Sequence, residues 1–156
     1  MLSVVRGQIE RRTLGRSGGA VRIAEHRNGG YPLAPSPDGK SVYYTGGRTD
    51  PSIWRAEVES GKEEKVLEGL LPGCWACWAL GKEGLYYIGA STATGTDARL
   101  VVFDLETKKA KVLAEIPQPM PPLGTGALSV APDGRRFLMV RVNRPNADVI
   151  RVEGFR

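Results

Sequence analysis

The two cysteines of the chain, Cys74 and Cys77, are separated by two residues in the stretch GCWACW at 73–78. A C-x-x-C pair can form a redox-active disulfide or supply half of a metal site where a turn or a helix start brings the two sulfurs together. The repeat alignment given below places 74–78 on an innermost β-strand, where positions i and i+3 face opposite sides and lie roughly 10 Å apart. A disulfide needs a Cα separation below about 7 Å. The sequence therefore predicts reduced cysteines that share no metal and pack between sheets, with Cys74 able to face a central channel.

Few other side chains have the chemistry of a catalytic site. His26 is the only histidine, and it follows Glu25 directly. General acid–base catalysis or metal binding needs such groups to converge, so the catalytic candidates are His26, Asp50 and Glu25, and the metal-ligand candidates are His26, Glu25 and Cys74. Asp50 precedes a proline, which favours a turn and gives it the alternative role of fixing its own loop.

Additional residues on predicted loops are candidates for contacting a ligand. They are Arg27, Arg48, Cys74, Asp97 and Arg144. No G-x-S-x-G, H-E-x-x-H or phosphate-binding Gly-rich motif accompanies them. No catalytic role is assigned to them on this basis.

Composition indicates an ordinary globular protein. The chain has 156 residues, of which 41% are hydrophobic and 25% charged, with a net charge of +5. Its basic residues are scattered, whereas a nucleic-acid surface gathers them on one face, so we expect no nucleic-acid partner. No apolar run approaches the ~20 residues of a membrane span. The N-terminal apolar stretch is too short for a signal peptide, so we expect no membrane association and, by default, a cytoplasmic protein.

The elements that would position these residues are short β-strands. Runs rich in β-branched and aromatic residues alternate with Gly, Pro, Asp and Ser: SVYYTG, SIWRAEV, LYYIGA, RLVVFDL, RFLMVRV and DVIRVEG. Runs of this kind at regular spacing predict an all-β protein.

The strands recur as internal repeats. Residues 34–44 align with 129–139 with Pro-Asp-Gly in register, and 77–87 form a middle copy in which Leu-Gly-Lys replaces that tripeptide. A second pair of strands follows, with 52–58 matching 99–105. Four strands per ~40–50 residues is the blade of a β-propeller. Pro-Asp-Gly suits the tight turn between the first two strands.

At these residues the chain resembles the TolB-like, WD-repeat-like β-propeller repeat family of bacteria. The resemblance rests on SPDGKSVYYTGGRTDPSIWRAEVESGKEEKVL at 36–67 and VAPDGRRFLMV at 130–140, and it extends from about residue 8 to 155. It implies a propeller that serves as an interaction platform. The repeat of that family contains no catalytic residue, so none is carried over.

The strand pattern predicts about three blades in one partial propeller domain. The expected parts are two strands of a seam blade at 8–24, full blades at 29–69 and 73–116, and three strands of a last blade at 125–156. A propeller ring needs 4–8 blades. Either the chain is a piece of a longer propeller or copies of it associate. We expect a homodimer that closes a six-bladed ring, in which Val21-Arg22-Ile23 of one chain completes the last blade of the other and residues 9–14 are displaced or added at the seam.

Two functions from different classes remain open. The first is a non-enzymatic scaffold or binding module, with a protein or small-molecule ligand at the channel mouth and no cofactor. The alternative is a hydrolase similar to lactonase and phosphotriesterase propellers, which would place a divalent metal or an acid–base pair at the mouth of the dimer.

Overall fold

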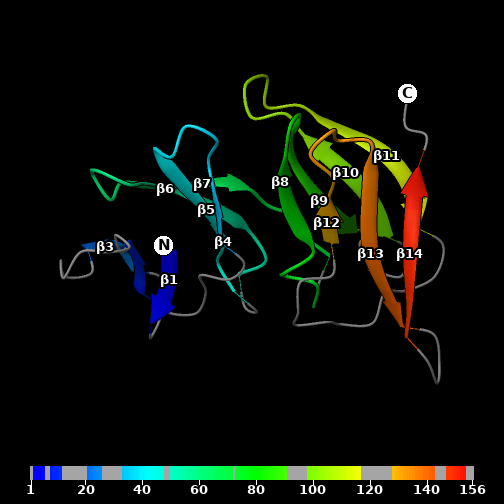
Figure 1. Ribbon diagram of the computed structural model, residues 1–156, viewed down its shortest axis with the longest axis horizontal. Helices are drawn as coiled ribbons and strands as arrows, with labels where there is room; N and C mark the ends of the chain where they lie inside the picture. Colours follow the sequence, from blue (N-terminus) through cyan, green and yellow to red (C-terminus); the bar gives the residue numbers. More distant parts are fainter. Residues whose placement is uncertain are drawn as a thin grey trace. The chain divides into compact units, whose positions relative to one another are not determined.

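The computed structural model describes residues 2–5, 8–11, 21–25, 33–47, 50–71, 73–90, 98–116, 128–142 and 147–153 (Figure 1). All the regular secondary structure in these ranges is β-strand, and the strands form four separate antiparallel sheets. The chain divides into two compact units, residues 1–68 and 69–156. Each unit is described here by itself.

The first unit contains two sheets. Sheet I has the order β1-β2-β3, and sheet II has the order β4-β5-β6-β7. The strands are β1 (Leu2–Val5), β2 (Gln8–Arg11), β3 (Val21–Glu25), β4 (Leu33–Pro35), β5 (Ser41–Thr45), β6 (Ile53–Glu57) and β7 (Glu63–Leu67). Strand β1 was not predicted from the sequence, so sheet I has three strands in place of the expected two.

The core of the first unit lies between its two sheets. Sheet I contributes Ile9, Ile23 and Ala24, and these pack with Val42 and Tyr44 of sheet II. Residues two apart on β5 share a face of the sheet, which is why alternate positions of one strand enter this core together. The packing of one sheet face on another is the arrangement that adjacent propeller blades require.

The second unit also contains two sheets. Sheet III has the order β8-β9-β10-β11, and sheet IV has the order β12-β13-β14. The strands are β8 (Trp78–Gly81), β9 (Gly84–Ala90), β10 (Ala98–Phe103), β11 (Ala110–Ile116), β12 (Leu128–Val130), β13 (Arg136–Val142) and β14 (Ala147–Glu153).

Sheets III and IV share a second core. Tyr86 and Ile88 of β9 pack with Phe137 and Met139 of β13, and the rings of Tyr86 and Phe137 lie 5.1 Å apart between centroids. The sheets approach closely at Gly81, where an added Cβ would lie 2.6 Å from Cγ1 of Val130. A glycine is therefore required at the end of β8.

The Pro-Asp-Gly segments form the tight turns predicted from the sequence. In the first, Gly39 has a φ of 69° and donates its N–H to the carbonyl of Ser36 at 2.9 Å. In the second, Gly134 has a φ of 70° and donates to Ala131 at 2.9 Å. The middle copy uses a shorter connection, with Gly81 paired directly to Gly84 across a two-residue turn.

Candidate functional site

Five of the predicted site residues lie outside the described part of the chain: His26, Arg27, Arg48, Asp97 and Arg144. Three are described, namely Glu25, Asp50 and Cys74. Cys74 belongs to the second unit and the other two to the first, so each position is considered in its own surroundings.

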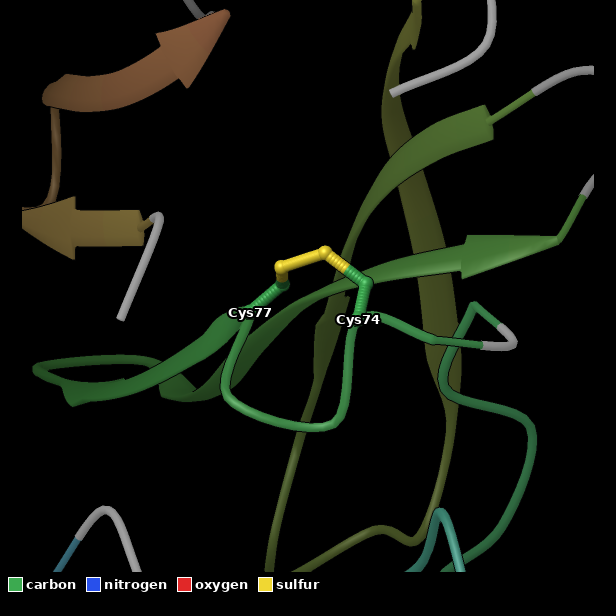
Figure 2. The surroundings of a disulfide bond; sticks show 2 residues. All are labelled: Cys74 and Cys77. Atoms are coloured by element: carbon green, nitrogen blue, oxygen red, sulfur yellow. A yellow bond between two sulfur atoms is a disulfide. The ribbon is translucent and has the colours of Figure 1, made fainter. Parts of the chain in front are cut away.

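Cys74 and Cys77 form a disulfide in a turn that leads into β8 (Figure 2). The Cys77 N–H donates to the carbonyl of Cys74 at 2.9 Å, and the Cys74 N–H donates to Leu71 at 2.8 Å. The Cα atoms of the two cysteines are 5.3 Å apart. The sequence-based prediction of reduced cysteines on an extended strand is therefore wrong.

The local sequence explains the turn. Gly73 has a φ of 78°, a conformation that glycine adopts without the steric cost paid by other residues. The chain pairs with β9 on both sides of the turn, because the Leu71 N–H donates to the carbonyl of Ile88 at 2.9 Å and the Ile88 N–H donates to the carbonyl of Cys77 at 2.9 Å. The continuous pairing of β8 with β9 begins at Trp78. Pro72 and Gly73, immediately before the first cysteine, were the available sequence signal for this turn. The repeat alignment extended the strand across it.

The disulfide is part of the core between sheets III and IV. Both cysteines are fully buried and pack in the cluster that contains Ile88 and Met139. Cysteine binds a metal through its thiolate, so the oxidised pair does not supply metal ligands. Cysteine-based exchange at this position would require opening of the surrounding packing, because an attacking thiolate must reach a sulfur.

Asp50 holds its own loop together. The Ser52 hydroxyl donates to Oδ1 of Asp50, and the indole Nε1 of Trp54 donates to Oδ2 at 3.0 Å. Gly46 lies against the same carboxylate, since an added Cβ would be 2.5 Å from Oδ2. The Gly46 N–H donates to the carbonyl of Ser52 at 2.9 Å. These contacts agree with the second role suggested for Asp50 in the sequence analysis, that of fixing its own loop.

Glu25 lies at the exposed end of β3. Its carboxylate pairs with the Arg22 guanidinium at 3.2 Å, and both side chains are more than half exposed. An exposed ion pair of this kind contributes about 0–1 kcal/mol to stability. The described contacts of Glu25 are those of a surface residue.

Two buried tyrosines were not singled out from the sequence. The Tyr44 hydroxyl donates to the Glu63 carboxylate, and burial, followed by that hydrogen bond and the negative charge, raises the pKa of Tyr44. Tyr86 is fully buried, and its hydroxyl has no hydrogen-bond partner. Aromatic residues in a strand pattern predict core packing, but not whether the hydroxyl of a buried tyrosine finds a hydrogen-bond partner.

The side chains that commonly bind metals do not cluster in the described ranges. No group of three or more His, Cys, Asp or Glu side chains comes together within them. Within the same ranges, no helix has the length and hydropathy that crossing a membrane requires.

Comparison with solved structures identifies the fold. TolB from Acinetobacter baumannii superimposes with a TM-score of 0.64 at 14% identity, over 94% of this chain and 35% of TolB. A "putative 6-phosphogluconolactonase" from Bacteroides uniformis superimposes with a TM-score of 0.50 at 16% identity, over 94% of this chain and 48% of that protein. The fold is propeller-like.

These similarities concern the fold alone, because both identities are far below 25%. The chain spans about a third of the length of TolB and about half of the other protein. No protein-family model and no curated protein sequence matches the chain.

Proposed function

We propose that this chain is a β-propeller scaffold or binding module whose ring is completed by a second copy of the chain. The observation that carries the proposal is sheet IV, which has three strands where sheets II and III have four. In the described part of the chain, β14 pairs with β13 alone and leaves its other edge open to a further strand. Open edges are sites where another chain adds by strand pairing.

The outer face of sheet IV supports the same proposal. Leu138 lies on β13 between Phe137 and Met139, which point into the core, and its own side chain is 53% exposed. Leu138 lines a shallow cavity of about 490 Å³ with Pro132 and with two exposed polar residues, Ser129 and Arg136. The exposed leucine beside this cavity is the point at which a blade of a second copy would pack on sheet IV.

Closure of a six-bladed ring would use β3 at the seam between the two copies. Strand β3 lies at the edge of sheet I, where it pairs with β2 alone in the described part of the chain, and Ile23 is buried against sheet II. The open edge of β3 could complete sheet IV of the partner, with β2 either added at the seam or displaced from it. We propose this pairing of β3 with β14 of the partner as the way in which the two copies close their ring.

The solution mass tests this proposal. We expect sedimentation equilibrium to give twice the 16.9 kDa of one chain. Leu138→Glu should shift the equilibrium towards monomer, because it places a charge on the proposed interface. Val112→Glu is the matched control, since Val112 is another exposed apolar strand residue, at 46%, and lies on sheet III. A monodisperse monomer at micromolar concentration would contradict completion by a second copy.

A hydrolase remains the second candidate, supported by the similarity in fold to the lactonase-named protein. It would place an acid–base or metal site at the loops that contain His26. A panel of lactones, esters and phosphotriesters, with elemental analysis for bound metal, tests it. If an activity is found, His26→Ala should lower the rate by about 10²-fold or more, as loss of a general base does. An unchanged rate would remove His26 from the site.

The disulfide changes the expected compartment. Disulfides persist in oxidising compartments and are rare in the cytosol. We propose that the protein functions where the Cys74–Cys77 bond is maintained, in place of the cytoplasmic location expected by default from the sequence. Mass spectrometry of alkylated protein from its native source would find two modified cysteines if this proposal is wrong.

A further inference from the structure

A cavity of about 320 Å³ lies between sheet III and the turn that joins β12 to β13. Sheet III contributes residues from β9, from β11 and from the β8–β9 turn, and sheet IV contributes Gly134 and Arg135. The cavity is therefore at the end of sheet III that holds its β8–β9 and β10–β11 turns. The disulfide turn and the β9–β10 connection belong to the opposite end, so the cavity is separate from the predicted channel mouth.

The Tyr86 hydroxyl is the unusual group in this cavity. Tyr86 is fully buried, yet its hydroxyl has no hydrogen-bond partner. The hydroxyl lies 3.0 Å from the position that a Cβ on Gly134 would occupy, so a glycine leaves room beside it. An unsatisfied buried polar group costs roughly 1–3 kcal/mol, which makes the orphaned hydroxyl of Tyr86, a residue that lines this cavity, a candidate for ligand contact.

The hydroxyl remains a hydrogen-bond donor at neutral pH. Burial raises the pKa of Tyr86, and the Glu83 carboxylate raises it further, while the Glu83 N–H lowers it without reaching hydrogen-bonding geometry. A protonated phenol without an acceptor needs an oxygen from a ligand to take its hydrogen bond.

Charged side chains around the hydroxyl define the ligand further. Lys111 and Arg135 are exposed and line the cavity with one carboxylate, Glu83. The two cations outnumber the one carboxylate, so the cavity favours a ligand with a single negative charge. A ligand with two negative charges would be repelled by Glu83. Val112 and Leu113 add an apolar wall. The volume is at the lower end of the range for small-molecule pockets.

We propose that this cavity binds a small organic monocarboxylate. One carboxylate oxygen accepts the Tyr86 hydrogen bond, Lys111 and Arg135 neutralise the charge, and the apolar part of the ligand lies against Val112 and Leu113. The site does not depend on the propeller ring or on the hydrolase candidate, because all its residues come from one unit of one chain.

Benzoate is a suitable probe, because it joins a carboxylate to an apolar ring. Titration followed by NMR chemical shifts should show saturable binding with a Kd on the order of 1 mM, as expected for so small a ligand. Benzamide has the same shape without the charge and should bind at least tenfold more weakly. Inorganic phosphate tests a dianion and should also bind more weakly than benzoate.

Four variants locate the binding. Tyr86→Phe keeps the ring and removes the donor, so it should weaken benzoate binding about tenfold, with an unfolding midpoint that is unchanged or higher. Arg135→Gln should also weaken binding, whereas Glu83→Gln should tighten it by removing the opposing charge. Lys109→Gln is the control, because it removes a nearby exposed cation that does not line the cavity, and it should have no effect beyond a small salt-dependent one.

Several results would overturn the proposal. They are equal binding of benzoate and benzamide, tighter binding of phosphate, or benzoate binding that Tyr86→Phe leaves unchanged. A lower unfolding midpoint in Tyr86→Phe would also overturn it, because the hydroxyl would then have a partner on which folding depends.

Discussion

At the scale of single residues, Lys108 has a backbone conformation that favours glycine. Its φ is 57°, the only positive value at a non-glycine position in the described ranges. Lys108 ends the β10–β11 turn, donating its N–H to Asp104 at 3.0 Å, as Gly61 ends the β6–β7 turn by donating to Glu57 at 2.9 Å. The same hairpin geometry is therefore built with glycine in one repeat and lysine in the next.

We expect Lys108→Gly to raise the free energy of unfolding by up to about 1 kcal/mol, because it relieves the left-handed conformation. Urea denaturation measures the effect. Lys109→Gly is the control and should be neutral or destabilising, since Lys109 has no positive φ. The reverse change, Gly61→Ala, should destabilise strongly, because its Cβ would lie 2.8 Å from the Ile23 carbonyl oxygen. A lower midpoint in Lys108→Gly would contradict this account of the turn.

Three turn aspartates make stability depend on pH. The pKa of Asp38 is lowered first by the Ser36 hydroxyl, that of Asp104 by the Thr107 N–H, and that of Asp133 by the Arg135 N–H. A depressed pKa in the folded state contributes stability above the unfolded value of 3.8, and this is lost as pH falls through the folded value.

We therefore expect the urea midpoint to fall as pH is lowered below about 4. In the native turn, the Arg135 N–H donates to Oδ1 of Asp133 at 3.0 Å. Asp133→Asn keeps an oxygen that can accept this hydrogen bond but removes the titrating carboxylate, so it should flatten the pH dependence. Glu59→Gln serves as the control, because it removes an exposed carboxylate from a different turn, the one between β6 and β7. An identical acid profile for Asp133→Asn and the native protein would mean that this carboxylate does not contribute.

At the scale of structural elements, the disulfide turn replaces the first part of an expected strand. A bond that closes so short a loop stabilises by about 2 kcal/mol in the chain-entropy model. We expect reduction under native conditions to be slow, because both cysteines are buried. Once reduced, the protein should show a lower urea midpoint.

Cys74→Ala/Cys77→Ala should reproduce that lower midpoint and become insensitive to reductant. Thiol titration of the unreduced, denatured native protein should find no free thiol. Two free thiols would restore the original strand prediction for this segment.

The repeat elements were predictable where local turn chemistry and strand pattern agree. Pro-Asp-Gly marked both longer turns, because proline, aspartate and glycine each favour a specific part of that geometry. The turn at 74–77 was missed because the alignment gave more weight to the repeat than to Pro72 and Gly73. The orphaned Tyr86 hydroxyl was unpredictable, since its surroundings depend on Gly134 from another sheet. Five of the predicted site residues remain predictions, because they fall outside the described ranges.

At the scale of the whole molecule, stability and association should be linked. If a second copy covers sheet IV, folding and dimer formation contribute to one equilibrium, and the unfolding midpoint should rise with protein concentration. Thermal unfolding over a hundredfold range of concentration measures this. The proposed interface should be of obligate size, above about 2,000 Å². A midpoint independent of concentration, together with a monomeric mass, would contradict the coupling.

The disulfide has an optical consequence. One indole, that of Trp75, lies within the four-residue turn closed by Cys74 and Cys77, and Trp78 begins the strand that follows. Disulfides quench the excited state of nearby tryptophans by accepting an electron, whereas thiols quench less efficiently. The third tryptophan, Trp54, belongs to the other unit. In a Trp54→Phe background, the emission intensity of the protein would therefore report directly on the oxidation state of its core.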